Sequence, residues 1–197
     1  MIVILGAEGQ DFLAKRQVLL STMATKLIIF VCVSNTCRSP MCEYLFRDKL
    51  VKSGLDSEFS VVSRSLSTDY EPQGSPANER GLEVSDHFRD WCTSIVLLIC
   101  LFYSQVLLKE YGVNMEAHRS KLLSADDAAE AFLIIPVKRD LGIFIKIQFP
   151  QFSSKVAFLD EDVADPWRQP YPVYAACARQ VDGLLASVLS KITSSER

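Results

Sequence analysis

Short apolar runs alternate along this chain with longer stretches in which apolar residues recur at helical spacing. A continuous apolar run of about four to eight residues is typical of a strand that is buried on both faces of a sheet. Pro136 ends one such run, because proline cannot donate the backbone hydrogen bond that a central strand needs. Four segments are predicted to be strands on this basis: residues 27–32, 59–62, 131–137 and 155–159.

Three other stretches carry the signals of helices. Ser39 is expected to cap the first helix, with Pro40 at its first position, and Gly54 is expected to end it. Residues 124–127, Ser-Ala-Asp-Asp, resemble a capping box that opens a second helix. The last segment has one apolar face, as an amphipathic helix requires. That face comprises Val173, Cys177, Val181, Leu184, Leu185, Val188 and Ile192.

Strands that alternate with helices predict a parallel sheet with helices on both faces. The length of 197 residues suits one domain with a sizeable core. We assign residues 23–197 to this domain and residues 1–22 to an N-terminal extension that is expected to be poorly ordered. Because Met23 stands just before the first strand, the sequence leaves open whether translation starts at Met1 or at Met23.

Residues 85–107 fit this fold poorly. Their core, residues 95–103, is an unbroken apolar run, but it is shorter than the roughly 20 residues that a helix needs to cross a bilayer. Without this stretch, the flanking residues would form one helix ending at Gly112. Three interpretations remain open: an additional core helix, a membrane-associating piece, or sequence foreign to the fold, such as an unspliced intron.

The balance of charge argues against some classes of partner. The chain has 21 Lys and Arg residues against 24 Asp and Glu residues and no basic stripe, so no nucleic-acid partner is expected. The N-terminus lacks the basic region of a signal peptide, and no membrane partner is expected. Six dispersed cysteines are better explained as free thiols in a reducing compartment than as a disulfide framework. A cytoplasmic location is therefore predicted.

The stretch VCVSNTCRSP, residues 31–40, joins the first strand to the first helix. A metal site is not expected, because Cys32, Cys37 and Cys42 are spaced five residues apart and no histidine is near them. A loop that enters a helix N-terminus instead aims backbone N–H groups and the helix dipole at an anion. The same field favours the thiolate of Cys32, and the planar guanidinium of Arg38 can bind two phosphoryl oxygens.

Two further residues of this loop have expected roles. Asn35 belongs to a residue type that tolerates a left-handed turn, and its amide can tie the loop to its neighbours. The Ser39 hydroxyl can donate a hydrogen bond to the sulfur of Cys32 when this sulfur is a leaving group. The alternative interpretation is a buried structural cysteine beside a surface arginine.

These residues resemble the phosphate-binding loop of the low-molecular-weight protein tyrosine phosphatases, in which a strand leads through C-x(5)-R-S into a helix. Asp165-Pro166 resembles the second motif of that family, and the resemblance is strongest at residues 27–50, 108–123 and 160–190. It implies a single α/β domain of the phosphotyrosine phosphatase I-like, Rossmann-like three-layer fold, with a four-stranded parallel sheet. It implies no cofactor and no metal.

The resemblance implies that Cys32 attacks phosphorus to form a phosphocysteine and that Arg38 stabilises the transition state. Asp165 would protonate the leaving phenol, which departs slowly as a phenolate because its pKa is about 10, and would then activate water. The rest of the phosphate-binding loop comprises Val33, Ser34, Asn35, Thr36, Cys37 and Ser39.

Other positions have supporting roles in this interpretation. His118 matches a family position that braces the loop through Asn35, and Ser63 or Ser65 could join the same network. Trp167 and Tyr171 would wall the pocket around an aryl ring.

Three cysteines besides the nucleophile are assigned by this resemblance and by the helical pattern. Cys37 is expected to form a reversible disulfide with Cys32, which would protect the thiolate from overoxidation. Cys42 and Cys177 are expected to be packing residues of helices.

The predicted substrate is a phosphotyrosine protein or a small aryl phosphate, with phosphoarginine also open; the oligomeric state is unknown. One alternative is an arsenate reductase on the same scaffold, in which Cys92 and Cys100 would relay a disulfide. The other is a catalytically impaired variant that binds phosphate, if residues 85–107 disrupt the fold.

Overall fold

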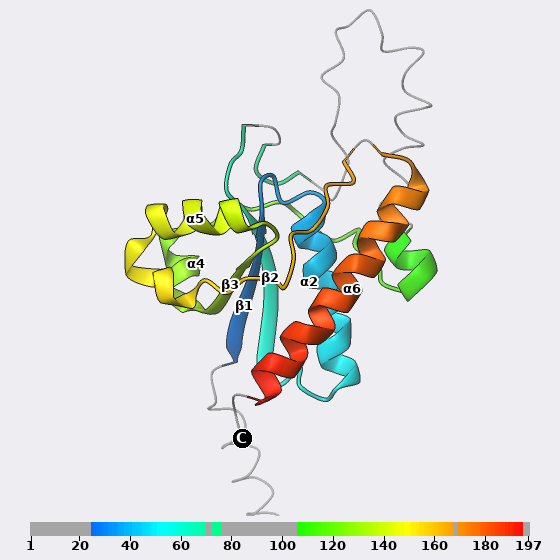
Figure 1. Cartoon of the computed structure of the whole chain (residues 1–197), viewed down its shortest axis with the longest axis horizontal. Helices are drawn as coiled ribbons and strands as arrows, with labels where there is room; N and C mark the ends of the chain where they lie inside the picture. The colour runs from blue at the N-terminus through cyan, green and yellow to red at the C-terminus, as the bar shows by residue number, and fades with distance from the viewer. Residues whose placement is uncertain (1–24, 70–71, 76–105, 168, 195–197) are drawn as a thin grey trace, which may run out of the picture.

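A parallel sheet forms the middle layer of the protein. The computed structural model describes residues 25–69, 72–75, 106–167 and 169–194. In these residues the central strand β1 (Lys26–Cys32) lies between β2 (Phe59–Ser65) and β3 (Ala131–Pro136), and it pairs with both in parallel (Figure 1).

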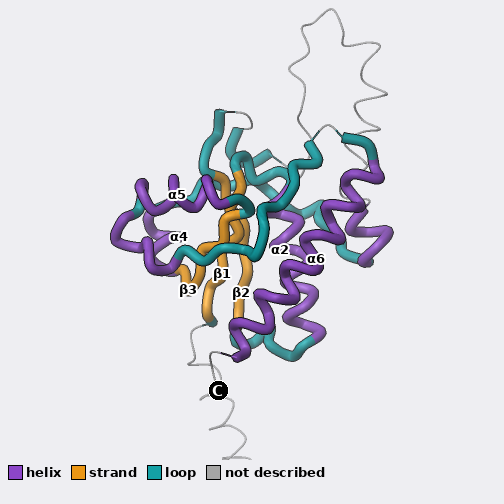
Figure 2. Tube along the Cα trace, viewed as in Figure 1, coloured by secondary structure: helices purple, strands orange, loops and turns teal. Residues whose placement is uncertain are grey.

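Helices cover both faces of the sheet (Figure 2). One face packs against α2 (Arg38–Lys52) and the long helix α6 (Tyr171–Ser194). The other face packs against α4 (Ala125–Glu130), α5 (Arg139–Gln148) and the 3₁₀ helix η3 (Pro150–Lys155). A short π-helical turn, η2 (Leu107–Tyr111), precedes the left-handed Gly112, where a helix end was predicted.

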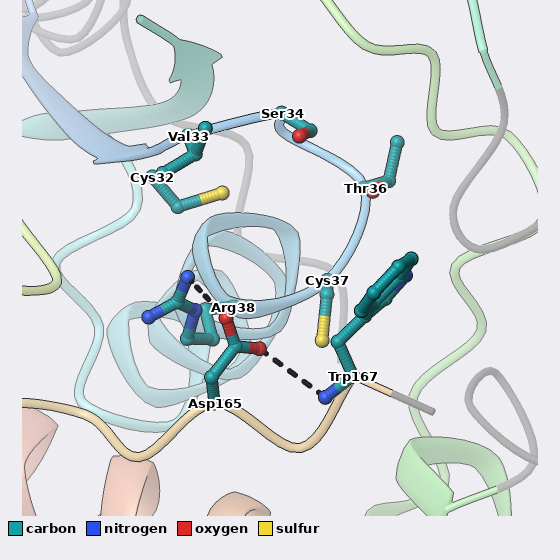
Figure 3. Close-up of a pocket in the computed structure, with 8 residues that line it drawn as sticks. All are labelled: Cys32, Val33, Ser34, Thr36, Cys37, Arg38, Asp165 and Trp167. Atoms are coloured by element: carbon teal, nitrogen blue, oxygen red, sulfur yellow. Dashed lines mark hydrogen bonds and ion pairs between the residues drawn. The ribbon is translucent and has the colours of Figure 1, made fainter. Parts of the chain in front are cut away.

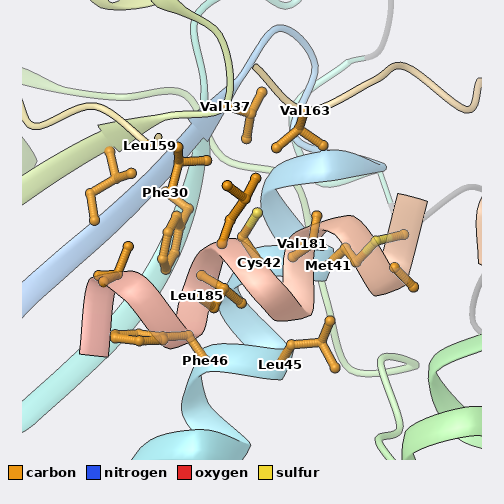
Figure 4. Packing of buried hydrophobic residues seen from close by; sticks show 14 of the residues in the cluster. Phe30, Met41, Cys42, Leu45, Phe46, Val137, Leu159, Val163, Val181 and Leu185 are labelled. Atoms are coloured by element: carbon orange, nitrogen blue, oxygen red, sulfur yellow. The ribbon is translucent and has the colours of Figure 1, made fainter. Parts of the chain in front are cut away.

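The alternation of side chains along β1 divides the core in two. Ile28 and Phe30 belong to the cluster with α2 and α6, whereas Ile29 and Val31 belong to the cluster with α4 and α5. Phe30 packs edge-on against Phe46 of α2 at 5.7 Å between ring centroids, in the cluster drawn in Figure 4. Burial on both faces is the reason that the first apolar run is continuous rather than alternating.

The predicted fold class is confirmed: the protein has one α/β domain with a parallel sheet and helices on both faces. The number of strands differs from the predicted four: the described residues form a sheet of three strands. Residues 155–159 contribute one parallel bridge, between Val156 and Ile134, since η3 continues to Lys155 and leaves little extended chain beside β3. No described helix has both the length and the apolar character that crossing a membrane requires.

The first helix begins two residues earlier than predicted. Cys37, and not Ser39, occupies the N-cap, and Pro40 is the third helical residue. Ser39 lies inside the helix, and its hydroxyl joins the loop instead: it donates to the sulfur of Cys32 and accepts from Asn35 Nδ2. Gly54 follows the helix with a φ of +69°, as its role as a stop signal requires.

Two other expectations about helices need correction. Val173 is 39% exposed, because it lies in the first turn of α6, although it was assigned to the apolar face. The sequence analysis did not identify α5. Its exposed Ile143, Phe144 and Ile147 obscure the amphipathic pattern on which such a prediction depends. The predicted extension, residues 1–22, and the apolar stretch, residues 85–107, lie outside the described residues apart from 106 and 107.

The predicted capping box opens α4. Asp127 N donates to Ser124 Oγ at 3.0 Å, and Ser124 N donates to Asp127 Oδ2 at 3.1 Å. The other carboxylate oxygen accepts from Arg64 Nη2 of β2 at 2.7 Å. Burial opposes ionisation of Asp127, but these hydrogen bonds outweigh burial and lower the pKa of its carboxyl to about 2.

We expect Asp127→Asn to lower the free energy of unfolding at pH 7 by about 2 kcal/mol, from the size of this pKa shift. Because the folded-state pKa lies below the ordinary 3.8, the carboxylate stabilises the fold above pH 3.8, and this contribution is lost as the pH falls toward about 2. Urea denaturation of both proteins between pH 7 and pH 3 should give a difference that shrinks on acidification. Asp126→Asn, at an exposed position of the same turn, is the control. A difference that does not vary with pH would contradict the ionised pair.

Candidate active site

Residues 33–37 join β1 to α2 and curl around the sulfur of Cys32, the last residue of β1 (Figure 3). Cys32 is 3% exposed. Its sulfur accepts hydrogen bonds from Asn35 N at 3.2 Å and from Ser39 Oγ at 3.0 Å. Both donors, together with the N-terminal end of α2, stabilise a negative charge on the sulfur. The loop therefore provides the environment that a nucleophilic thiolate requires.

A cavity of about 250 Å³ opens above this loop. The loop forms one wall, and residues 165–167 form the opposite wall (Figure 3). The lining residues are Cys32, Val33, Ser34, Thr36, Cys37, Arg38, Asp165 and Trp167. The cavity thus brings the predicted nucleophile, the predicted anion-binding arginine and the predicted acid to one place.

Arg38 and Asp165 meet across this cavity. Arg38 Nη2 lies 2.7 Å from Asp165 Oδ2, with the arginine side chain buried and the aspartate side chain 50% exposed. The other aspartate oxygen accepts from Trp167 N at 3.2 Å, which orients the carboxylate toward the cavity. A phosphoryl group bound by Arg38 would therefore lie within reach of this carboxylate.

Asn35 holds the loop in shape. Its φ of +57° is left-handed, as the residue type allows. Its side-chain amide donates to Ser63 Oγ at 2.7 Å and to Ser39 Oγ at 3.0 Å, and its Oδ1 accepts from Lys121 N at 2.9 Å. Its backbone carbonyl faces His118 Nε2 at 2.7 Å. His118 and Ser63 therefore brace the loop, whereas the Ser65 hydroxyl donates to the carbonyl of Lys121.

The other described cysteines differ from Cys32 in their environment. Burial raises the pKa of the Cys37 and Cys42 thiols well above the ordinary value, and it raises that of Cys177 to about 11. These three residues are therefore protonated at neutral pH and unsuited to nucleophilic attack. Cys42 and Cys177 pack in the core between α2 and α6. All four described cysteines are free thiols, and the predicted disulfide between Cys32 and Cys37 stays a prediction.

Comparison with known proteins agrees with this geometry. The family model "Low molecular weight phosphotyrosine protein phosphatase" matches residues 27–87. The solved structure of a low molecular weight protein tyrosine phosphatase from T. tengcongensis matches with a TM-score of 0.68 and 27% identity, over 85% of this chain and 99% of that one. These matches support the low-molecular-weight protein tyrosine phosphatase family for this chain, and the relatives found are protein phosphatases, which are hydrolases.

Relatives of this phosphatase differ in the substrate that their names state. A protein-arginine-phosphatase from Geobacillus stearothermophilus is 25% identical over 176 residues, which cover 86% of this chain and 97% of that protein. A low molecular weight phosphotyrosine protein phosphatase from Schizosaccharomyces pombe is 40% identical over 57 residues, which cover 29% of this chain and 36% of that protein. The names of these relatives agree on a protein phosphatase but differ in the phosphorylated residue on which it acts.

Glu43 contacts the residues that brace the loop and was not predicted from the sequence as a site residue. Glu43 lies on α2 beneath the loop and is 7% exposed. Its Oε2 accepts from Ser63 Oγ, and its Oε1 accepts from Arg47 Nη2, each at 2.5 Å. The signal available in the sequence was that Glu43 is one acidic residue whose neighbours on the predicted helix are buried. Its partner Ser63 lies on β2, so only the packing of helix against strand brings the two together.

The two aromatic residues near Asp165 that were predicted to wall the pocket lie in different places. Trp167 lines the cavity with 44% of its surface exposed. Tyr171 is not among the lining residues of this cavity, and its role in the substrate pocket stays a prediction. It is the first residue of α6, and its hydroxyl donates to Glu110 Oε1 at 3.4 Å. Because α6 begins at Tyr171, this side chain faces Glu110 of η2.

Proposed function

We propose that this phosphatase hydrolyses phosphotyrosine in proteins through a phosphocysteine intermediate. The observation that carries the proposal is that Cys32, Arg38 and Asp165 line one cavity, at the loop that stabilises an anionic sulfur. In the first step the sulfur of Cys32 attacks phosphorus, and the bond from phosphorus to the phenolic oxygen breaks. Asp165 gives its proton to that oxygen, so the product leaves as a neutral phenol.

In the second step, water attacks the phosphorus of the phosphocysteine. Asp165, now ionised, takes a proton from this water, and Cys32 leaves as a thiolate that accepts the hydrogen bond of Ser39. The negative charge of the transferring phosphoryl group is stabilised by the guanidinium of Arg38 and by the backbone N–H groups of the loop. The exposed indole of Trp167 supports an aryl substrate, because it offers an apolar wall at the mouth of the cavity.

Phosphoarginine is the second candidate substrate. The relatives that match over nearly their whole length, from Geobacillus stearothermophilus and Bacillus subtilis, are named protein-arginine-phosphatases. The chemistry of the site accepts either leaving group, since a guanidine must also gain a proton to depart and Asp165 can supply it. Arsenate reduction is not proposed, because its relay cysteines, Cys92 and Cys100, lie outside the described residues.

The test is a comparison of three peptides of one sequence that carry phosphotyrosine, phosphoarginine or phosphoserine. With the full chain and EDTA present, we expect kcat/KM for the phosphotyrosine peptide to exceed that for the phosphoserine peptide by about 100-fold, because only the aryl group fills the cavity beside Trp167. A higher value for phosphoarginine than for phosphotyrosine would move the assignment to the second candidate. Equal rates on phosphoserine and phosphotyrosine would overturn the proposal.

A further inference from the structure

Three large apolar side chains are exposed on the helix α5. Ile143 is 57% exposed, Phe144 is 63% exposed and Ile147 is 71% exposed. Ile147 follows Ile143 by one helical spacing and Phe144 by the other, and side chains at such spacings share one face of a helix. These three residues therefore form one apolar patch, which we call the α5 patch. Clustered apolar side chains on a surface, unlike single ones, mark a site of interaction.

The fold does not need the α5 patch, because α5 packs against the core through a different face. Gly142 and Ile145 are the buried residues of this helix, and Ile145 belongs to the core cluster on this side of the sheet. A Cβ atom at Gly142 would lie 2.3 Å from the ring of Phe158, so the helix is seated closely on its neighbours. The patch lies on the outer side of α5, which itself lies at one edge of the molecule (Figure 1).

Basic side chains border the α5 patch. Arg139 and Lys146 of α5 both stand over the ring of Phe158, at 5.7 Å and 5.1 Å from its centroid. In the described part of the chain neither of these cations pairs with a carboxylate, whereas Lys138 is compensated by Asp140 at 3.3 Å. The whole chain carries a formal charge of -3, so this border is opposite in sign to the net charge of the protein. The outer side of α5 thus combines exposed apolar groups with uncompensated positive charge.

We propose that the α5 patch docks on the anionic surface of a lipid bilayer. Ile143, Phe144 and Ile147 enter the boundary between headgroups and acyl chains, as the apolar face of an interfacial helix does. Arg139 and Lys146 extend along the flank of the helix to the negatively charged headgroups. A ridge on the outside of a helix can enter lipid without a partner of matching shape, whereas a folded protein would need a complementary groove.

The same charges argue against a second copy of this chain as the occupant. A symmetric contact of two such patches would bring the cations of one copy against those of the other. Attachment to lipid differs from the sequence-based expectation of no membrane partner, which took no account of α5. The attachment is peripheral, because no described helix could cross a membrane.

The start of α5 lies beside the segment that leads to Asp165. The backbone N–H of Arg139 donates to Asp162 Oδ1 at 2.9 Å. Attachment through α5 therefore holds the cavity near a bilayer and near phosphoproteins at the same surface. Only this consequence rests on the proposed function; the binding to lipid does not.

The experiment is co-sedimentation of the full chain with two kinds of vesicle, one of phosphatidylcholine alone and one that also contains phosphatidylserine at about one third of the lipid. We expect the partition coefficient for the anionic vesicles to exceed that for the neutral vesicles by about tenfold. This difference should disappear at a salt concentration of about 1 M, where screening shortens the range of the charges to about 3 Å.

The apolar part of the inference is tested by a triple variant that combines Ile143→Gln, Phe144→Gln and Ile147→Gln. Its partition coefficient for anionic vesicles should be lower by about 50-fold, because the inserting side chains are gone while glutamine preserves the helix. Val51→Gln is the matched control, since Val51 is also 57% exposed but lies on α2. This control should bind vesicles as the unchanged protein does, and circular dichroism should show equal helix content in all three proteins.

The charge part is tested by Lys146→Gln, a single exchange that keeps the apolar patch intact. It should lower binding to anionic vesicles by about fivefold and leave binding to neutral vesicles unchanged, because each cation near an anionic surface contributes about 1 kcal/mol. Lys52→Gln makes the same change in net charge on α2, where Lys52 pairs with Asp48. This control should bind both kinds of vesicle as the unchanged protein does.

Three outcomes would overturn the inference. The first is a protein that binds neither kind of vesicle or binds both equally. The second is unchanged binding by the triple variant, which would assign the attachment to another segment, such as residues 85–107. The third is a dimer that sedimentation velocity detects without lipid and that the triple variant abolishes, because the patch would then be the contact between two copies. A chain that binds vesicles through α5 but hydrolyses no phosphate ester would support this inference and defeat only the proposed function.

Discussion

Cys32→Ser is expected to abolish hydrolysis of p-nitrophenyl phosphate, with kcat lower by about 10⁴-fold or more. A serine hydroxyl needs a base to take its proton, and the partners of this side chain in the described residues, Asn35 N and Ser39 Oγ, are both donors. The described residues around this side chain therefore offer donors that can stabilise an anionic sulfur, but no base that would deprotonate a serine hydroxyl. The measurement is steady-state kinetics on the full chain between pH 5 and pH 8.

Cys177→Ala provides the control for this substitution. Cys177 is a buried thiol on α6, with its sulfur 3.5 Å from the carbonyl of Ala164, and it does not line the cavity. Its replacement should leave kcat within a factor of about two to three, because it removes packing but no group that lines the cavity. Turnover by Cys32→Ser comparable with that of the unchanged protein would exclude the phosphocysteine mechanism.

Asp165→Asn is expected to lower kcat by about 10²- to 10³-fold for an aryl phosphate whose phenol has a pKa near 10. The loss should be much smaller for p-nitrophenyl phosphate, because that phenolate departs without a proton. Kinetics with a series of phenols of graded pKa should therefore give a steeper dependence on the leaving group in the variant. Glu161→Gln, at an exposed carboxylate of the same segment, is the control.

The ion pair between Asp165 and Arg38 adds a second readout for the same variant. Asp165 Oδ2 lies 2.7 Å from Arg38 Nη2, so the carboxylate competes with a phosphate oxygen for this guanidinium. Asn carries no charge and competes less, so inorganic phosphate should inhibit the variant at an equal or lower concentration. Weaker inhibition by inorganic phosphate, together with an equal loss of kcat for every leaving group, would indicate a damaged site. This result would contradict the role of Asp165 as the acid.

The parts of the site that are adjacent along the chain could be predicted from the amino-acid sequence. Cys32, Asn35, Arg38 and Ser39 lie within eight residues, where the end of a buried strand enters a helix. A loop this short has few conformations, and a left-handed residue at position 35 is one of its requirements. The roles of Cys32 as the proposed nucleophile and of Arg38 as the proposed anion-binding residue could therefore be predicted from the local sequence. The capping box of α4 could be predicted for the same reason.

The tertiary structure alone decided which distant residues meet this loop. The parallel register places Ser63 beside Phe30 and Ser65 beside Cys32, yet Asn35 turns back to Ser63. Glu43 reaches Ser63 only because α2 packs on β2, and Tyr171 contacts Glu110 because α6 begins at this residue. Local sequence constrains backbone angles over a few residues, whereas these contacts depend on how separate elements pack together.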